Sequence, residues 1–148
     1  MKRILILQGP NLNALGSREP TVYGRETLDE IQQRLEILAR QFDCEVECRQ
    51  SNHEGVLLDA LYSAKARADG VLLNPGGLSH TSVALRDAVA ASGLPVVEVH
   101  LSNPSAREAF RHSSLISGAA VAVVQGFGPA GYELALRGLV GVLSREDQ

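Results

Sequence analysis

A tyrosine and two arginines lie close together near the N-terminus, and together they could abstract a proton. The segment Gly16–Gly24 contains Arg18 and Tyr23, and Arg25 follows it directly. A phenol is a poor base at neutral pH because its ordinary pKa is about 10. An opposite charge within a few ångströms lowers such a pKa by about 1–3, so Arg18 could hold Tyr23 partly as tyrosinate. Taken alone, the loop is better interpreted as a polar lid with a structural tyrosine.

A glutamate and a histidine two residues apart form a second reactive pair. Glu98 and His100 end a valine-rich run, and on a strand they would share one face. A carboxylate in that position fixes the tautomer of the imidazole and favours its protonated form. A proton donor to a leaving hydroxyl requires this form. Half a metal site is the alternative, but no third and fourth ligand follow at a recognisable spacing, so we expect no metal.

The elements that must position these residues are visible as alternating apolar runs and helical patterns. Strands are expected at 4–7, 44–48, 71–73, 96–99 and 119–124. Helices are expected at about 28–42, 82–92 and 129–144, with a short one starting at Asn103-Pro104. Another is expected along the apolar stripe Leu57, Leu61, Ala64 and Ala68. Local signals support these bounds: a Thr27-x-x-Glu30 capping box, a cap at Ser51 or Asn52, and a stop at Gly93 and Pro95.

Alternating strands and helices imply a parallel sheet covered on both faces. Right-handed crossovers then favour a flavodoxin-like α/β fold, a doubly wound five-stranded parallel sheet of order 2-1-3-4-5. No linker, repeat or low-complexity segment divides the chain, so residues 1–148 are expected to form a single domain. Ligands of such sheets bind beyond the carboxyl ends of the strands, where strands 1 and 3 diverge.

This topology gathers seven polar residues around one crevice. They follow strands 1, 3 and 4: Asn11, Arg18, Tyr23, Asn74, His80, Glu98 and His100. Any one of them could be structural, and the asparagines could simply cap turns. Their convergence at the ligand-binding edge instead favours a site. A Tyr/Arg base, a Glu-oriented His acid and amide donors suit proton abstraction beside a carbonyl, followed by elimination through a stabilised enolate.

Composition excludes several classes of protein. The 148 residues carry a net charge of −3, with 21% charged and 4% aromatic residues, and no basic run suggests a nucleic-acid partner. No apolar stretch approaches the roughly 18 residues that span a membrane. The N-terminal apolar run is too short for a signal peptide, so a cytoplasmic location is expected. Cys44 and Cys48 would lie about 13 Å apart on one strand, too far to bridge, and are interpreted as small hydrophobes.

Some familiar motifs do not fit. The G-x-G-x-x-G run at 126–131 lacks a following strand with an acidic residue, so its glycines are expected to serve tight packing. A receiver domain would need acids where Gln8 and Asn74 stand. Neither Lys2 nor Lys65 is placed to form an imine.

The chain resembles type II 3-dehydroquinate dehydratase over essentially its whole length. The resemblance rests on ordered motifs: Gly9-Pro10-Asn11-Leu12-Asn13, Gly16-x-Arg18-Glu19-Pro20-x-x-Tyr23-Gly24, Asn74-Pro75-Gly76-Gly77-x-x-His80-Thr81-Ser82, Glu98-Val99-His100-Leu101-Ser102-Asn103 and Gly126-x-Gly128. Ala14 departs from the larger aliphatic residue that is frequent there, which would loosen the packing of the lid.

The resemblance implies a cofactor-free dehydration of 3-dehydroquinate to 3-dehydroshikimate in the shikimate or quinate pathway. Tyr23 would remove the C2 proton, with Arg18 holding it near tyrosinate. Asn11 would hold a water on the enolate oxygen, and His100, supported by Glu98, would protonate the departing C1 hydroxyl.

It also implies how the anionic substrate would be held. Asn74 and the backbone amides of Leu101 and Ser102 would bind its carboxylate, and His80 and Arg111 would grip the ring hydroxyls. The Tyr23 loop would close as a lid.

Only the resemblance to the family implies that this chain assembles into an oligomer. Family members form trimers packed into dodecamers, and Asp87 would reach the site of a neighbouring subunit. The alternative function is a non-catalytic flavodoxin-like module that binds a small anion or nucleotide at the same crevice. Arg107 is a weaker ligand candidate than the residues above, with a place on a helix surface as the alternative. Arg25 either assists Tyr23 or faces solvent. Three others are interpreted as capping, contact or solvated groups: His53, Glu54 and His112.

Overall fold

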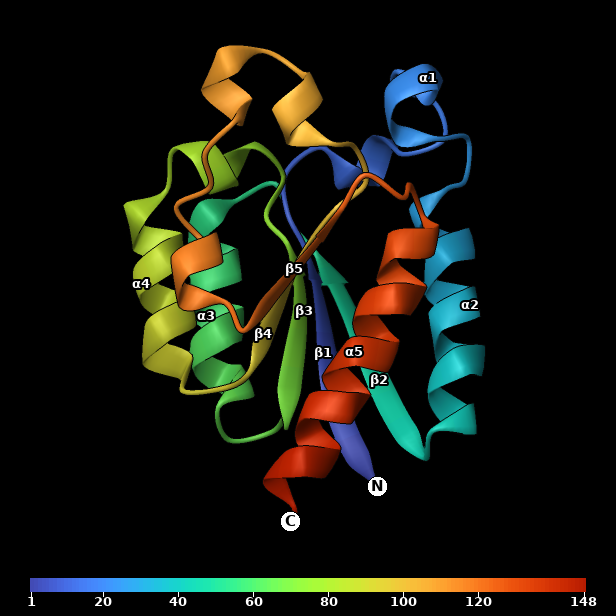
Figure 1. Cartoon of the computed structure of the whole chain (residues 1–148), viewed down its shortest axis with the longest axis vertical. Coiled ribbons are helices and arrows are strands. Elements are labelled where there is room, and N and C mark those ends of the chain that lie inside the picture. The colour runs from blue at the N-terminus through green and yellow to red at the C-terminus, as the bar shows by residue number, and fades with distance from the viewer.

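The alternating pattern forms one parallel sheet, in the predicted order. The computed structural model describes all residues 1–148. Its five strands run β2-β1-β3-β4-β5, all parallel (Figure 1). Their bounds are β1 Lys2–Gln8, β2 Cys44–Gln50, β3 Gly70–Asn74, β4 Val96–His100 and β5 Ala122–Gln125. The predicted flavodoxin-like fold is therefore confirmed.

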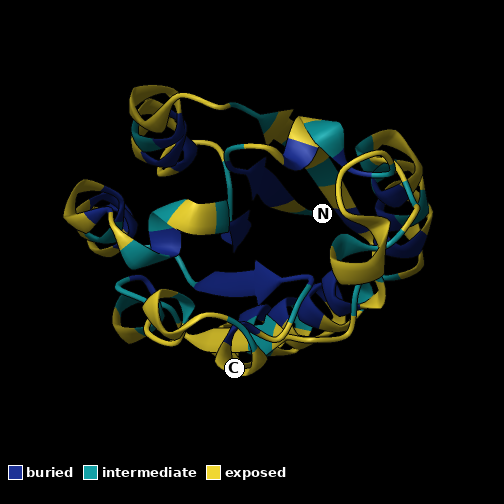
Figure 2. Cartoon of the chain, turned by 90° about the horizontal axis from the view of Figure 1, so that it is seen from above, coloured by how far each residue is buried: buried dark blue, intermediate teal, exposed yellow.

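Helices cover both faces of this sheet. The main ones are α2 Leu28–Gln41, α3 Glu54–Ala64, α4 Val83–Ser92 and α5 Ala130–Glu146, and a single turn, α1 Pro20–Tyr23, precedes them. α2 packs beside α5 on one face, and α3 beside α4 on the other (Figure 1). Figure 2 shows the buried strands between the two layers, with the outer faces of the helices exposed.

Two aliphatic clusters form the core, one on each face. Along β1, Ile4 and Ile6 enter the cluster under α2 and α5, while Leu5 and Leu7 enter the cluster under α3 and α4. A strand buried on both faces has no polar alternation, which explains the continuous apolar run in the sequence. β2 lies at the edge and alternates, with Cys44 and Cys48 facing the core as free thiols.

Most local signals operate as predicted. Thr27 Oγ1 accepts from the Glu30 amide at 3.2 Å. The structure adds a cap that was not predicted, because Ser82 Oγ accepts from the Leu85 amide at 2.9 Å. Gly93 ends α4 in the left-handed conformation, φ 67°. Asn103 caps only a 3-10 turn, Pro104–Ala106, in place of the short helix expected there.

Three predicted boundaries are wrong. α3 ends at Ala64, so Ala68 of the predicted stripe lies beyond it. The last strand begins at Ala122 and not at Ala119, because the residues before it form a 3-10 turn in which the amides of Ala119 and Ala120 bond to the Ile116 carbonyl. Neither Ser51 nor Asn52 caps α3, whose N-cap is His53. Their side chains are used within the loop instead.

The caps are replaced by loop contacts. Ser51 Oγ accepts from the His53 amide at 3.0 Å, and Asn52 Oδ1 accepts from the Asn11 amide at 2.8 Å. The second contact ties the loop after β2 to the loop after β1, beside the crevice.

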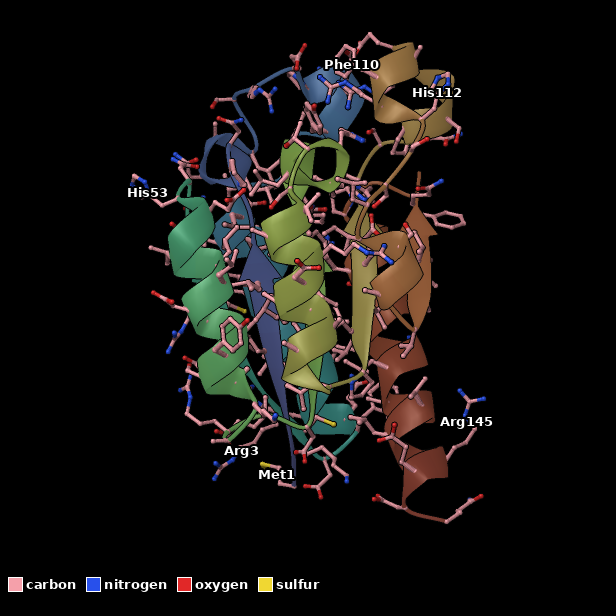
Figure 3. All side chains as sticks on the ribbon, turned by 90° about the vertical axis from the view of Figure 1, so that its left-hand side faces the viewer. Met1, Arg3, His53, Phe110, His112 and Arg145 are labelled. Carbon is pink, nitrogen blue, oxygen red and sulfur yellow. The ribbon has the colours of Figure 1, made fainter.

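Three further 3-10 turns lie near the carboxyl ends of the strands: Leu12–Ala14, Gly76–His80 and Ala109–Arg111. Figure 3 shows Phe110 and His112 at this end and Met1, Arg3 and Arg145 at the other. In the G-x-G-x-x-G run, Gly131 lies against Val124 and Val99, as packing glycines should. No helix combines the length and apolar character needed to cross a membrane.

Candidate active site

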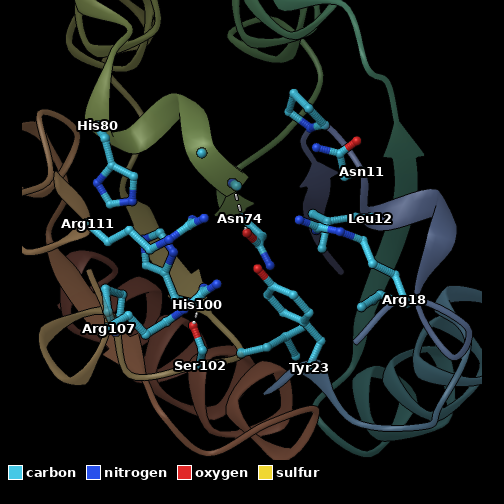
Figure 4. A pocket seen from close by; sticks show the side chains of 16 residues that line it. Asn11, Leu12, Arg18, Tyr23, Asn74, His80, His100, Ser102, Arg107 and Arg111 are labelled. Carbon is cyan, nitrogen blue, oxygen red and sulfur yellow. Dashed lines mark hydrogen bonds between the residues drawn. The ribbon is translucent and has the colours of Figure 1, made fainter. Parts of the chain in front are cut away.

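A cavity of about 180 Å³ opens at the carboxyl ends of β1, β3 and β4 (Figure 4). Its lining is Pro10, Asn11, Leu12, Leu15, Arg18, Tyr23, Asn74, Gly76, Gly77, His80, His100, Leu101, Ser102, Pro104, Arg107 and Arg111. All but two of the predicted site residues line it. The exceptions are Glu98, which lies behind His100, and Asp87, which is exposed on α4.

Tyr23 faces the cavity between two guanidinium groups. The Cζ atoms of Arg18 and Arg107 lie 4.9 Å and 5.2 Å from the centroid of its ring. Tyr23 ends α1, which begins after Glu19 in the left-handed conformation, φ 40°, and is followed by Gly24 at φ 90°. These two unusual backbone positions fold the segment back so that Tyr23 points inward.

Arg107 is therefore a cavity residue, and the helix-surface alternative is wrong. It follows the Pro104–Ala106 turn in extended conformation, which turns its side chain back over Tyr23 and Ser102. Its Nη1 donates to Ser102 Oγ at 3.2 Å. Arg25 lies outside the cavity lining.

His100 and Glu98 form the predicted pair on one face of β4. The Nε2–H of His100 donates to Glu98 Oε2, and Nδ1 of His100, which has no protein partner, is left for the cavity. Glu98 is fully buried. Burial alone would raise the pKa of Glu98, but hydrogen bonds from His100, Ser117 and Ser114 and the charge of His100 hold it below its ordinary value. Glu98 is thus a carboxylate at neutral pH.

Two serines that sequence reasoning missed complete the surroundings of Glu98. Ser117 Oγ donates to Glu98 Oε1 at 2.6 Å, and Ser114 Oγ donates to Oε2 at 2.8 Å. Ser114 also accepts from the amides of Ile116 and Ser117. These serines lie in an irregular segment with no periodicity, so only the contact itself identifies them.

Three N–H donors form a cradle on the β3–β4 side of the cavity. The backbone amides of Leu101 and Ser102 have no hydrogen-bond partner in the protein. Beside them, the side chain of Asn74 lines the cavity (Figure 4). Unpaired amides at the mouth of a cavity are suited to bind a carboxylate.

His80 and Arg111 flank the other side. His80 Nδ1 donates to the Ser113 carbonyl at 2.9 Å, which holds the ring at the cavity wall, and Ser79 Oγ lies 3.4 Å from its Nε2. Arg111 donates to Glu108 and lies over the ring of Phe110. Asn11, in left-handed conformation at φ 70°, lines the cavity with its side-chain amide from the loop after β1 (Figure 4).

Comparison with known proteins decides the family. The family model described as "Dehydroquinase class II" matches residues 2–140. The chain belongs to the class II dehydroquinases. This confirms the resemblance noted from the sequence motifs and the predicted hydro-lyase class of enzyme.

Individual relatives agree with this family. A 3-dehydroquinate dehydratase of Gloeobacter violaceus is 54% identical over 143 residues, covering 97% of this chain and 89% of the relative. The catabolic 3-dehydroquinase 2 of Aspergillus flavus is 50% identical over 150 residues, covering 99% and 100%. Among solved structures, the type II dehydroquinase of Propionibacterium acnes has a TM-score of 0.92 at 40% identity, covering 95% and 97%.

Proposed function

We propose that this class II dehydroquinase converts 3-dehydroquinate to 3-dehydroshikimate without a cofactor, residues 1–148 acting as one catalytic domain. One observation carries the proposal. Tyr23, between two guanidinium groups, and His100, bonded to a buried carboxylate, line the same cavity. A base and an acid at one site are what an elimination requires. The names of the relatives support the substrate.

The first step is proton abstraction by Tyr23. The positive charges of Arg18 and Arg107 stabilise a phenolate at their distances from the ring. The phenolate takes the C2 proton, and the electron pair of the C–H bond moves into the adjacent carbonyl, giving an enolate. Asn11 stabilises the enolate oxygen through a bound water.

The second step is loss of the C1 hydroxyl. The enolate pair re-forms the carbonyl and makes the new carbon–carbon double bond while the C–O bond breaks. His100 donates a proton to the leaving hydroxyl, which departs as water. Carboxylate Glu98 stabilises the imidazolium before transfer, and the proton on Tyr23 returns through solvent to His100.

The substrate is held mainly by polar contacts. Its carboxylate binds the amides of Leu101 and Ser102 with the side chain of Asn74, whose positions support this assignment. His80 and Arg111 bind the ring hydroxyls. Closure of the segment that carries Tyr23 excludes water during the reaction.

We also propose a cytoplasmic homo-oligomer of trimers packed into a dodecamer, in which Asp87 reaches a neighbour's cavity. An open sheet edge supports association, because Val121 and Val123 beside and on β5 are 53% and 41% exposed. The exposed position of Asp87 on α4 is also consistent with a contact between subunits.

The test is ultraviolet absorbance of purified protein mixed with 3-dehydroquinate in the presence of a chelator. The product is a conjugated enone carboxylate and the substrate is not, so absorbance follows dehydration directly. We expect a rise that the chelator does not suppress. A flat trace from folded protein would overturn the proposed reaction.

A further inference from the structure

A fully buried tyrosine lies behind the cavity and bonds to one of its residues. The hydroxyl of Tyr132, on α5, accepts from Nδ2 of Asn74 at 2.8 Å and donates to Oε1 of Gln8 at 2.6 Å. Tyr132 and Gln8 are both 0% exposed, and neither lines the cavity. The proposed reaction therefore leaves both residues without a role.

The hydrogen bonds from Gly76 through Asn74 and Tyr132 to Gln8 form a chain, here called the relay. The backbone fixes which atom donates at each step of the relay. The amide of Gly76 donates to Oδ1 of Asn74 at 3.0 Å, and a backbone N–H cannot accept. The oxygen of the Asn74 side chain must then face Gly76, and its nitrogen must face Tyr132. Burial raises the pKa of Tyr132, so the hydroxyl stays protonated and donates a hydrogen bond to Oε1 of Gln8.

Gln8 accepts the hydrogen bond from Tyr132, but its own side-chain nitrogen is left without a partner. Its Nε2 is buried with no partner, which is unfavourable. A Gln8 side chain with its amide flipped would be less favourable, because its NH₂ group would face the Tyr132 hydroxyl. The hydroxyl proton of Tyr132 would then have no acceptor. The observed orientation supplies the acceptor that Tyr132 needs.

The relay leaves one hydrogen of Asn74 unused. Nδ2 carries two hydrogens, and the second has no acceptor in the protein. Because Asn74 lines the cavity beside the unpaired amides of Leu101 and Ser102, the amide group offers the ligand a donor. A rotated side chain would instead offer a carbonyl oxygen, which repels an anion.

We propose that Tyr132, supported by Gln8, is a positioning residue that locks Asn74 with its N–H toward the substrate and so selects a carboxylate at this subsite. The proposal rests on the proposed function for the identity of the ligand. Tyr132 acts only through Asn74, and it touches neither substrate nor reacting atoms.

The test is Tyr132→Phe, which removes only the hydroxyl. Loss of a hydrogen bond that orders a charge-binding donor costs about a factor of ten in affinity. We expect KM for 3-dehydroquinate to rise about tenfold with kcat changed much less. Asn74→Ala should raise KM at least as much, and adding Tyr132→Phe to Asn74→Ala should raise it no further.

A matched control separates positioning from stability. Leu139 lies on the same helix and packs on Gly70, at the opposite end of β3 from Asn74. Leu139→Ala should lower Tm at least as much as Tyr132→Phe does and leave KM unchanged. An unchanged KM in Tyr132→Phe, or effects of the two site substitutions that simply multiply, would overturn the proposal.

Wild-type turnover in the same assay tests the proposed function separately. If the wild-type protein were inactive, the same double-substitution comparison would be made with dissociation constants for quinate, a ring carboxylate. If Tyr132→Phe weakened quinate binding in the wild-type background but not in Asn74→Ala, the relay would be supported although the reaction had failed. If the two effects simply multiplied, the relay would be overturned.

Discussion

Single residues at the site are controlled by charges of opposite sign. Tyr23 lies between the cations Arg18 and Arg107, whereas His100 is bonded to the anion Glu98. In the proposed reaction, Tyr23 accepts a proton and His100 donates one within the same cavity. The two arrangements can be tested independently, because they share no side chain.

The base is tested by Tyr23→Phe. Since general-base catalysis contributes about 10²–10⁴-fold, we expect turnover to fall by at least two orders of magnitude. Binding of substrate should change little, because the loss falls on the transition state. Tyr62→Phe is the control, since Tyr62 is 55% exposed on α3 and should keep full activity. Near-native turnover of Tyr23→Phe would refute the assignment.

The pH dependence is tested by Ser117→Ala. This change removes one donor from Oε1 of Glu98, so the pKa of Glu98 rises. The acid-side fall of kcat should then move to higher pH than in the wild type, while Ser144→Ala, a distant hydroxyl, should leave the profile in place. A pH profile of kcat that does not move, or that moves to lower pH, would show that Ser117 does not stabilise the negative charge of Glu98.

The same group affects stability with a definite sign. The folded pKa of Glu98 lies below 4.5, so its carboxylate contributes stability above about pH 4.5. That contribution is lost as the pH falls through the folded pKa.

At the scale of elements, the site depends on close contact between the loops after β1 and β3. The Gly9 amide donates to the Asn74 carbonyl at 2.8 Å, continuing the pairing of the two strands. A Cβ on Gly9 would lie 2.7 Å from the Pro75 carbonyl oxygen, and a Cβ on Gly76 would lie 3.0 Å from that of Pro10. This contact places Asn11 and Asn74 on the same cavity.

The contact is tested by Gly9→Ala. Because the obstructing atoms are backbone, the strands must separate, and we expect a loss of about 1–3 kcal/mol in the free energy of unfolding. Gly55→Ala is the control, since beyond the nearby backbone of its own helix no atom lies within 4 Å of its Cβ position, and it should be neutral or slightly stabilising. Urea denaturation of both variants makes the comparison, and equal stabilities would contradict the argument.

At the scale of the whole molecule, the doubly wound topology determines where the chemistry lies. β1 and β3 are neighbours at the centre of the sheet, and their crossovers leave in opposite directions, so a crevice opens between the loops that follow them. β4 adds its end to the same edge. One chain supplies every predicted site residue except Asp87, which only the proposed assembly would bring to a cavity.

The assembly is tested by complementation. Asp87→Ala should lower turnover although Asp87 lies outside its own chain's cavity, and Asp59→Ala, another exposed acid, should not. When Asp87→Ala and Tyr23→Phe subunits are unfolded together and refolded, mixed assemblies contain sites with both residues intact. Turnover should then exceed that of either variant alone. Absence of any gain in confirmed mixed oligomers would exclude Asp87 from a neighbour's site.

The sequence by itself determined the alternation of elements, the cap at Thr27, and the order of the sheet. These depend on local periodicity and on the handedness of crossovers, both of which are readable along the chain. The same topology placed Asn11, Tyr23 and His100 at one edge, because the carboxyl ends of parallel strands must meet there. The chemical types at that edge then carried the predicted reaction.

Only the tertiary structure decided which residues support that edge from behind. Tyr132 and Gln8 are 124 positions apart, and Ser114 and Glu98 are 16 apart, yet each pair is in hydrogen-bond contact. Side-chain bonds between distant segments follow no period, so no pattern along the chain reveals them. The place of Arg107 over Tyr23 was decided in the same way, by a turn whose direction depends on the packing around it.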